Sequence, residues 1–190
     1  MARWEPDARE RLVLAALDLF VEQGYDNTGV VEIAERAGLT KSTFFRHFPD
    51  KREVLFVGQD TLNGYLADGI AGAPDAATPL EAIAGALDAV AVVFPPERRE
   101  FASRRRTVIA ANPELQERDA LKRAGFAAAM TDALERRGVS EPTARVAAEL
   151  GVLAFRSAFA RWADPACDRD FGDLARQELE ALQAASASLS

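Results

Sequence analysis

Residues 38–48, GLTKSTFFRHF, place two cationic side chains, the only histidine of the chain and three phenylalanines in eleven positions. Thr40 is a good N-cap and a proline follows the stretch, so the spacing predicts a short helix over about 41–48. In that helix Phe44 and Phe48 are four residues apart and share one face. We therefore expect a helix with an apolar inner face and a cationic outer face.

The charge of the whole chain makes this cationic stretch informative. The 190 residues carry a formal net charge of -7, with 48% hydrophobic and 28% charged residues, which is typical of a globular protein and argues against a broad coating of nucleic acid. Residues 36–52, in contrast, contain five Lys or Arg and one acid, a net charge of about +4. This asymmetry favours a local site for an anionic partner. The alternative is a solvated charged face on an ordinary helical bundle.

The sequence offers little for catalysis or for metal binding. Cys167 is the only cysteine, so thiols can build neither an intrachain disulfide nor a four-ligand zinc site. There is no Gly-rich phosphate loop, and the single histidine has no nucleophile and base that the sequence can place beside it. We expect no cofactor and no metal, and an enzyme is a minor alternative. Without a signal-like or membrane-spanning apolar run, the expected location is cytoplasmic, with no membrane partner.

The pattern along the chain predicts an all-α protein, because no segment alternates with period two for long and Ala, Leu, Glu and Arg dominate. The expected helices run over about 7–23, 30–37, 41–48, 50–69, 79–94, 97–111, 113–137, 141–163 and 168–186. A segment rich in glycine, proline and small residues at 69–79 predicts a domain boundary. We therefore expect an N-terminal helix-turn-helix domain over 7–56, with a connecting helix to about 69, and a helical domain over 79–187.

Residues 9–56 resemble the DNA-binding region of TetR-family transcriptional repressors. The matching pieces are AALDLFVEQGYDNT at 15–28, EIAERAGLTKSTFFRHF at 32–48, and the DK pair at 50–51 that opens the fourth helix. The resemblance implies an N-terminal three-helix DNA-binding domain and a C-terminal bundle for ligand binding and dimerisation. It further implies a homodimer on a palindromic double-stranded DNA operator, with repression relieved by a small molecule.

The family's contact residues carry over to individual positions of this chain. The resemblance implies base contacts from Lys41, Ser42 and Thr43, and phosphate contacts from Thr28, Phe45, Arg46, His47 and Lys51. Three positions depart from the family: Phe45 replaces a usual tyrosine, Gly29 replaces a capping threonine, and Val31 replaces a residue that is often charged. We therefore expect fewer phosphate contacts than is usual in the family. The departures also leave open a ligand-binding module whose DNA-binding region is vestigial.

Two apolar stripes in the last two expected helices predict the dimer interface. Small residues recur at helical spacing in the first helix and leucines in the second, and a small-residue stripe lets two helices approach closely. Together with the resemblance they give the expected interface residues Ala147, Gly151, Ala154, Ala158, Leu174, Leu179 and Leu182. The alternative is that both stripes pack within one chain.

Large apolar residues on the helices that the family arranges around a cavity predict the ligand pocket, although each of them singly could be ordinary core. The expected pocket residues are Phe101, Arg105, Val108, Phe126, Met130, Phe155, Phe159 and Trp162. Arg105 belongs to an RRR run at 104–106, which either points one arginine inward or is exposed throughout. The C-terminal half is also similar to mycofactocin-type regulators of the family. That similarity implies an acyl-CoA or another hydrophobic effector.

Overall fold

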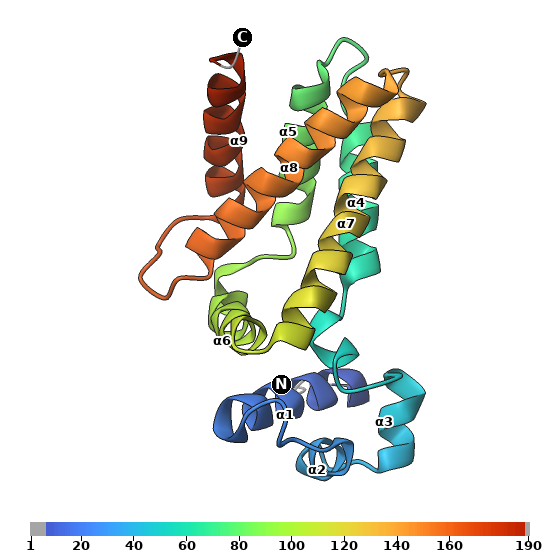
Figure 1. Cartoon of the computed structure of the whole chain (residues 1–190), viewed down its shortest axis with the longest axis vertical. Coiled ribbons are helices and arrows are strands. Elements are labelled where there is room, and N and C mark those ends of the chain that lie inside the picture. Colours follow the sequence, from blue (N-terminus) through green and yellow to red (C-terminus); the bar gives the residue numbers. More distant parts are fainter. Residues whose placement is uncertain (1–6, 189–190) are drawn as a thin grey trace, which may run out of the picture. The chain divides into compact units, whose positions relative to one another are not determined.

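The computed structural model describes residues 7–188, and the elements found there are all helical (Figure 1). They are α1 Ala8–Gln23, α2 Val30–Arg36, α3 Lys41–His47, the 3₁₀ turn η1 Glu53–Phe56, α4 Gln59–Ala71, α5 Pro79–Ala91, the 3₁₀ turn η2 Pro96–Arg98, α6 Arg99–Ala110, α7 Pro113–Arg136, α8 Glu141–Trp162 and α9 Phe171–Ala187. The all-α prediction is confirmed. In this described part of the chain, no single helix has both the length and the hydropathy needed to cross a membrane.

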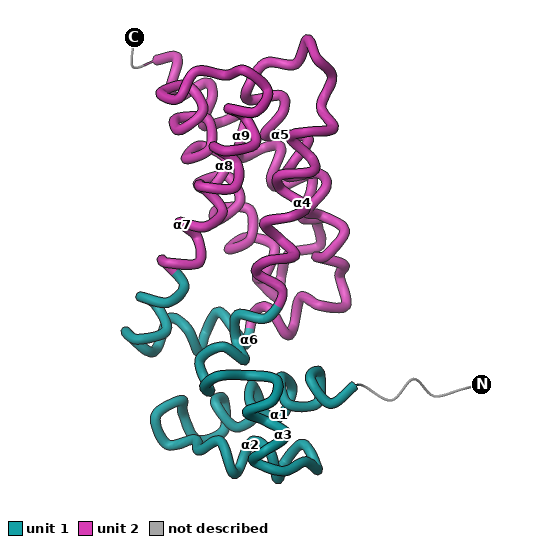
Figure 2. Tube along the Cα trace, turned by 90° about the vertical axis from the view of Figure 1, so that its right-hand side faces the viewer, with its two compact units in different colours: residues 1–57, 104–119 teal, residues 58–103, 120–190 magenta. Residues whose placement is uncertain are grey.

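The helices form two compact units, coloured separately in Figure 2. Unit 1 comprises the chain up to Val57 together with Arg104–Asp119, and unit 2 comprises Gly58–Ser103 together with the chain from Ala120 onward. Residues 104–119 thus pack with the N-terminal helices, although we expected them in the C-terminal domain. Because α6 and α7 each contribute residues to both units, these two helices connect them covalently. The functional division into two domains remains a prediction.

The expected single helix over 50–69 is interrupted. The structure has η1 up to Phe56, then Val57 in an extended conformation, and α4 starts only at Gln59. Gly58 adopts the left-handed conformation with φ of 85°, which a residue with a side chain rarely adopts. The unit boundary lies at this glycine.

Unit 1 has the apolar core that the sequence predicts. Leu12, Phe20 and Ile33 are at most 3% exposed, and Phe44 of α3 and Phe48, the residue that caps α3, join them at 0% and 2%. The Phe44 and Phe48 rings lie 5.6 Å apart. Apolar burial of this kind is the main force that holds a short helix in place, since an isolated seven-residue helix is unstable in water.

Unit 2 is built around α5, which packs against α4, α8 and α9. The closest approach joins α4 and α5 at Gly69, where an added Cβ would lie 2.6 Å from the Cα of Ala86. Five aromatic side chains then form a ring cluster between the end of α5, α8 and α9: Phe94, Phe155, Phe159, Trp162 and Phe171. Phe126 of α7 extends this cluster at 5.2 Å from Phe155.

Candidate nucleic-acid interface

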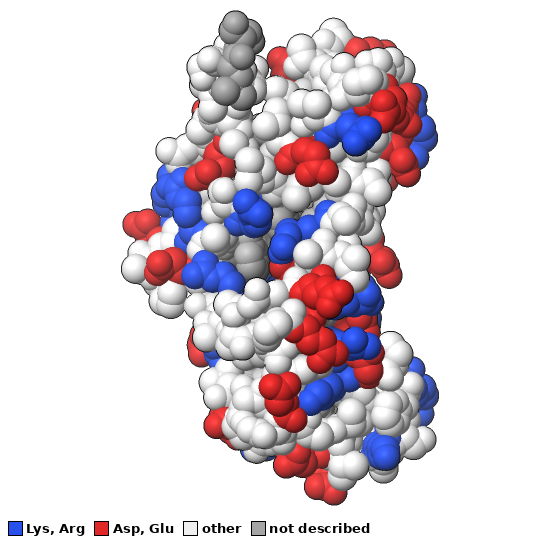
Figure 3. Space-filling view, in the orientation of Figure 1, with Lys and Arg blue, Asp and Glu red and all other residues white. Residues whose placement is uncertain are grey.

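The helix α3 presents a cationic surface away from the core of unit 1. Its N-cap Thr40 accepts a hydrogen bond from the backbone N–H of Thr43 at 3.1 Å, as the sequence predicts. Lys41 and Arg46 are exposed, and neither forms an ion pair with any residue in 7–188. On the face drawn in Figure 3, positive and negative side chains are interspersed over much of the surface. The outer face of α3 is therefore a small local patch rather than part of a broad positive field.

The three residues expected at base edges differ in their exposure and in their hydrogen bonding. Lys41 and Ser42 are exposed, whereas Thr43 is half-buried and its hydroxyl lies 3.0 Å from that of Thr40. A hydroxyl in this position still has acceptor capacity for an outside donor. All three residues lie in the first turn of α3, where the unpaired backbone N–H groups also favour an anion.

Phe45 is an exposed aromatic residue beside Lys41. The ring is 47% exposed and packs edge-on against Phe44 with centroids 5.6 Å apart. The ammonium nitrogen of Lys41 lies 5.9 Å from the Phe45 ring centre, within the range of a cation–π contact. Phe45 thus belongs to the outer face of α3, as the sequence predicts, and offers that face an apolar surface with no hydroxyl.

Thr28 does not present its hydroxyl to the outside, which corrects the expected phosphate contact. Its side chain is 2% exposed, and its hydroxyl donates to the carbonyl oxygen of Gly24 at 2.8 Å. The amide of Gln23 donates to the same hydroxyl at 3.4 Å. Thr28 therefore closes the turn between α1 and α2, a role that its place just before a helix start could have indicated.

Lys51 is engaged within unit 1. The ammonium group donates to the carbonyl oxygens of Tyr25 at 2.7 Å and Thr28 at 3.0 Å. An ammonium has three protons, so these two bonds leave one for a phosphate oxygen. The expected phosphate contact of Lys51 remains a prediction, and the structure adds a bridging role to it.

His47 is half-buried at the end of α3. Its Nε2 atom is buried and has no hydrogen-bond partner among residues 7–188. Its ring centre lies 6.4 Å from that of Phe48. A phosphate contact through Nε2 would need the ring to turn outward, so Nδ1 is the better placed donor for the predicted contact.

Two arginines within residues 36–52 are paired with acids of unit 1, and two of these acids, Glu22 and Glu114, lie outside that window. Arg36 forms a bidentate pair with Glu22, with the shorter contact at 2.8 Å. Arg52 pairs with Asp50 at 2.7 Å and with Glu114 at 3.0 Å. The guanidinium of Arg36 lowers the pKa of Glu22, and that of Arg52 lowers the pKa of Asp50. Both arginines are thereby anchored, which leaves Lys41 and Arg46 as the free cations of α3.

The cap of α2 forms without a threonine. The carboxylate of Glu32 accepts the backbone N–H of Gly29 at 2.7 Å, which is the half of the capping box that the sequence retains. This hydrogen bond is the main cause of the lowered pKa of Glu32. Val31 follows on the exposed side, 45% accessible. The departure at Gly29 therefore removes a hydroxyl from this surface but does not break the helix start.

The expected dimer residues need a correction, because unit 2 buries most of them in its own interior. The four small residues of α8 are buried, and an added Cβ at Gly151 would lie 2.8 Å from Cγ2 of Ile83 and 3.1 Å from the sulfur of Met130. The small-residue stripe thus allows α8 to approach the α5 and α7 helices of the same chain. Of the leucines of α9, Leu174 and Leu179 are buried and only Leu182 is partly exposed.

The expected ligand residues divide between the units. Unit 2 contains six of them: Phe101, Phe126, Met130, Phe155, Phe159 and Trp162. Four of these six belong to the aromatic cluster, namely Phe126, Phe155, Phe159 and Trp162. Arg105 and Val108 belong to unit 1. There the Nε of Arg105 donates to the carbonyl oxygen of Leu55, its guanidinium lies 5.3 Å from the Phe56 ring centre, and burial lowers the pKa of Arg105 to about 10. The expectation that Arg105 joins the aromatic pocket is therefore wrong.

The other two arginines of the run at 104–106 also belong to unit 1. Arg104 pairs with Asp18 of α1 at 2.6 Å, and Arg106 is exposed. The run therefore lies on unit 1 and not in the aromatic cluster of unit 2.

Sequence reasoning missed Phe94 and Phe171 as members of the aromatic cluster of unit 2, where their ring centres are 4.5 Å apart. The pair of prolines after Phe94 marked only a helix break and gave no sign that the ring turns inward.

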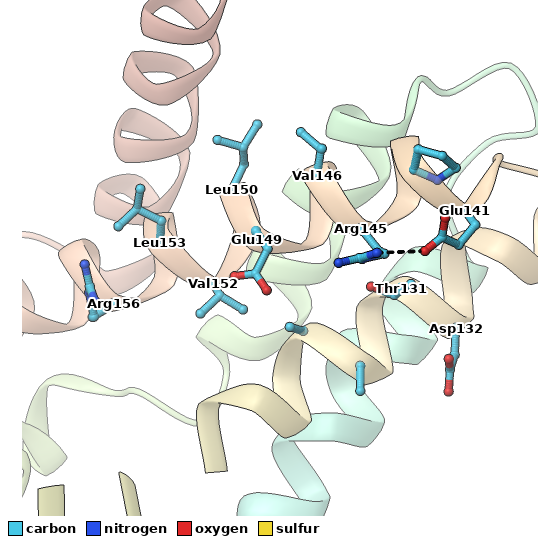
Figure 4. A pocket seen from close by; sticks show the side chains of 13 residues that line it. Thr131, Asp132, Glu141, Arg145, Val146, Glu149, Leu150, Val152, Leu153 and Arg156 are labelled. Atoms are coloured by element: carbon cyan, nitrogen blue, oxygen red, sulfur yellow. Dashed lines mark hydrogen bonds and ion pairs between the residues drawn. The ribbon is translucent and has the colours of Figure 1, made fainter. Parts of the chain in front are cut away.

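An open groove of about 980 Å³ lies elsewhere on unit 2, between α7 and α8 (Figure 4). Val146, Leu150 and Leu153 project from one side of α8 at its rim, and Val146 is 62% exposed. Arg145 pairs with Glu141 at 3.1 Å along the same helix. None of the eight expected pocket residues lines this groove.

Comparison with known proteins agrees with this geometry. Residues 12–56 match the family model for bacterial regulatory proteins of the tetR family. The HTH-type transcriptional regulator TcmR of Streptomyces glaucescens is 38% identical over 82 residues, which are 43% of this chain and 36% of TcmR. The HTH-type transcriptional activator FasR of Mycolicibacterium smegmatis is 42% identical over 48 residues, 25% of this chain and 22% of FasR. The chain thus spans little more than a third of these relatives' length at most.

A solved structure extends the likeness over both halves. FadR from Bacillus subtilis, determined in complex with stearoyl-CoA, has a TM-score of 0.62 with 19% identity, covering 90% of this chain and 96% of FadR. At that identity the likeness shows the fold. The fold of unit 2 therefore also occurs in bacterial regulators.

Proposed function

The chain belongs to the TetR family of bacterial regulatory proteins, and we propose that it binds double-stranded operator DNA as a homodimer and represses transcription until a small-molecule effector releases it. The observation that carries this proposal is the two-sided helix α3, with Phe44 and Phe48 inside and Lys41 and Arg46 outside without acidic partners among residues 7–188. A helix with this arrangement can lie in the major groove, with its first turn at the base edges.

The DNA-binding step can be tested by selecting duplexes from a random library with the purified protein at about 0.1 M salt. We expect enrichment of a palindrome, because a dimer places two recognition helices on half-sites about one helical turn, or a multiple of it, apart. The double variant Lys41→Ala/Arg46→Ala should lose binding. The matched control Arg98→Ala/Arg136→Ala removes two exposed cations from unit 2 and should retain it. Failure of the wild-type chain to enrich any sequence would instead favour a ligand-binding module with a vestigial DNA-binding region.

For the dimer, we propose an interface on the outer row of α8 instead of the buried small-residue stripe. Val146, Leu150 and Leu153 recur at helical spacing and remain exposed or half-exposed at the rim of the groove. An exposed apolar row rimmed by charges such as Arg145 and Glu149 has the composition of a protein interface.

The interface can be tested by sedimentation. Val146→Glu introduces a charge into the proposed interface and should shift the protein from dimer to monomer. Val92→Glu is the matched control, because Val92 is similarly exposed at 67% but lies at the end of α5 and does not line the groove. A dimeric Val146→Glu variant, or a monomeric Val92→Glu variant, would place the interface elsewhere.

For the effector, we propose that a hydrophobic or acyl-CoA-type molecule binds at the aromatic cluster of unit 2. Phe94 and Phe159 are half-buried, so the cluster reaches the surface of unit 2, and aromatic side chains are typical linings of small-molecule sites. The fold similarity to a regulator that binds stearoyl-CoA supports this ligand class. Thermal melting with acyl-CoAs of increasing chain length tests it, because a ligand of the folded state raises the melting temperature. The same compound should release the selected operator.

Whether the bound regulator represses or activates needs a separate test. The relative FasR is an activator, whereas release by an effector is simplest for a repressor that blocks a promoter. A reporter placed behind the selected operator should be more active in cells without the protein. Lower activity without the protein would make it an activator while leaving the DNA-binding proposal intact.

A further inference from the structure

Two buried N–H groups at the aromatic cluster have no acceptor among residues 7–188. Trp162 is 0% exposed, and its indole Nε1 has no hydrogen-bond partner among residues 7–188. The Nε of Arg99 is also buried and unpaired in this part of the chain. The guanidinium carbon of Arg99 lies 5.7 Å from the centre of a Trp162 ring, so the two side chains are in contact. Buried donors normally have a partner, and a pair of exceptions side by side indicates a missing acceptor.

Arg99 is held so that this donor stays available. One terminal nitrogen donates to the carbonyl oxygen of Cys167, and the other donates to that of Arg169 at 2.8 Å. Both acceptors are neutral backbone groups in the connection between α8 and α9. Arg99 forms no ion pair within residues 7–188, so no carboxylate in this part of the chain matches its positive charge. A buried or half-buried cation of this kind favours an anionic partner.

The surroundings of the two donors are apolar and aromatic. The Phe94 ring centre lies 5.4 Å and the Phe159 ring centre 6.0 Å from that of Trp162. Phe94 and Phe159 are half-buried, so the aromatic cluster reaches the surface of unit 2. A molecule bound here would have its polar end at Arg99 and Trp162 and its apolar body against phenylalanine rings.

We propose that Arg99 and Trp162 bind the carboxylate of an amphipathic effector whose hydrocarbon part lies against Phe94 and Phe159. This inference rests on the proposed function, because it places the effector of that function at the aromatic cluster and names its chemical class. A carboxylate has two oxygens that accept from both donors and a charge that matches the guanidinium. A water or an alcohol could accept the hydrogen bonds but would leave the charge of Arg99 unmatched.

Calorimetric titration with octanoate and with 1-octanol tests the proposal, because the two probes share a chain and differ in the head group. We expect octanoate to bind the wild-type protein, and to bind Arg99→Met and Trp162→Phe about tenfold more weakly or worse, since each change removes a bond to a charged group. The affinity of 1-octanol should be weaker and should fall less in both variants, because a hydroxyl can accept a hydrogen bond but carries no charge to match that of Arg99. Arg98→Met is the control, since Arg98 is exposed on the neighbouring turn η2. Trp162→Phe keeps an aromatic ring, so it answers the question even if Arg99→Met folds poorly.

Two results would overturn the proposal. One is the absence of octanoate binding to the wild-type protein, which would assign the two donors to an ordered water alone. The other is octanoate affinity that is unchanged in both variants. If octanoyl-CoA binds and releases the operator while octanoate does not, the proposed function stands and the carboxylate site falls. If no DNA is bound but octanoate binding depends on Arg99 and Trp162, the carboxylate site stands and the regulator proposal falls.

Discussion

The ammonium group of Lys51 lies 2.7 Å from the carbonyl oxygen of Tyr25 and 4.3 Å from the centre of the same residue's ring. A second bond to the carbonyl oxygen of Thr28 completes the contact. One side chain thus ties the turn after α3 to the connection between α1 and α2. The position of α3 on unit 1 therefore depends on a lysine that the family resemblance assigns only to DNA.

Lys51→Met should lower the stability of unit 1 and not only its affinity for DNA. The variant keeps the apolar stem but leaves two carbonyl oxygens without their donor, at a cost of about 1–3 kcal/mol. Urea unfolding followed by circular dichroism measures the change. Lys41→Met is the matched control, because Lys41 is exposed, and it should unfold like the wild type. Equal stabilities of the two variants would show that the Tyr25 bridge contributes nothing.

Lys41→Ala should relax sequence preference. A lysine at a base edge discriminates between bases, and loss of one such contact costs about 1–3 kcal/mol on the correct site only. Binding to the selected operator should therefore weaken more than binding to random duplex of the same length. Equal losses on both duplexes would assign Lys41 to the phosphate backbone.

Phe45→Tyr should add a phosphate contact. Phe45 is 47% exposed on the outer face of α3, and a hydroxyl at the ring edge can donate to the DNA backbone. Each phosphate contact that displaces a counterion steepens the dependence of log affinity on log salt by about 0.9, whereas a neutral hydroxyl displaces none. We therefore expect a higher affinity of Phe45→Tyr on all sequences with an unchanged salt slope. A change confined to one base position would instead assign residue 45 to base contacts.

Gly69→Ala should destabilise unit 2, and Gly64→Ala should stabilise it. Both glycines lie in α4, but an added Cβ at Gly69 would lie 2.6 Å from the backbone of Ala86, whereas at Gly64 nothing lies within 4 Å. Alanine in an unobstructed helix interior gains about 0.5–1 kcal/mol over glycine, while overpacking against backbone costs about 1–3 kcal/mol. Urea midpoints that shift in the same direction for both variants would contradict the close approach of α4 and α5.

Asp50→Asn should lower the free energy of unfolding at neutral pH but not in acid. Asp50 accepts from the Arg52 guanidinium at 2.7 Å, and this bond, with the backbone N–H groups of Glu53 and Arg52, lowers the pKa of Asp50. Because the folded value lies below the unfolded value of about 3.9, the stabilisation is present above pH 4 and is lost as the pH falls through the folded pKa. Unfolding free energies of the two proteins should therefore converge below pH 4. A constant difference would mean that the carboxylate charge is unimportant.

The elements that the sequence predicted well are those in which a local pattern and a packing demand agree. In α3, the four-residue spacing of Phe44 and Phe48, the Thr40 cap and the following proline all specify one short helix. The interruption at Gly58 was not predicted, because isolated glycines are tolerated inside helices and the flanking residues favour helix on both sides. Only the backbone conformation distinguishes a tolerated glycine from a required one.

Side-chain partners far apart in the chain were beyond any local pattern. Arg36 meets Glu22 at a separation of 14 residues, and Arg52 meets Glu114 at a separation of 62. A count of charges within 36–52 therefore overestimated the free positive charge near α3. In the same way, the small-residue stripe of α8 predicts a close helix contact but not whether the partner helix belongs to the same chain.

The sequence by itself determined that this chain is helical, that its amino-terminal helices form a helix-turn-helix core, and that α3 carries cations on its outer face. These properties follow from spacings of a few residues, because side chains three or four residues apart lie on the same face of a helix. Only the tertiary structure decided which cations are free and where Arg105 lies. It also showed that buried N–H groups of Arg99 and Trp162 have no acceptor among residues 7–188. These properties depend on groups that folding brings together from distant parts of the chain. The free energies of their hydrogen bonds and ion pairs depend on how far burial removes them from water.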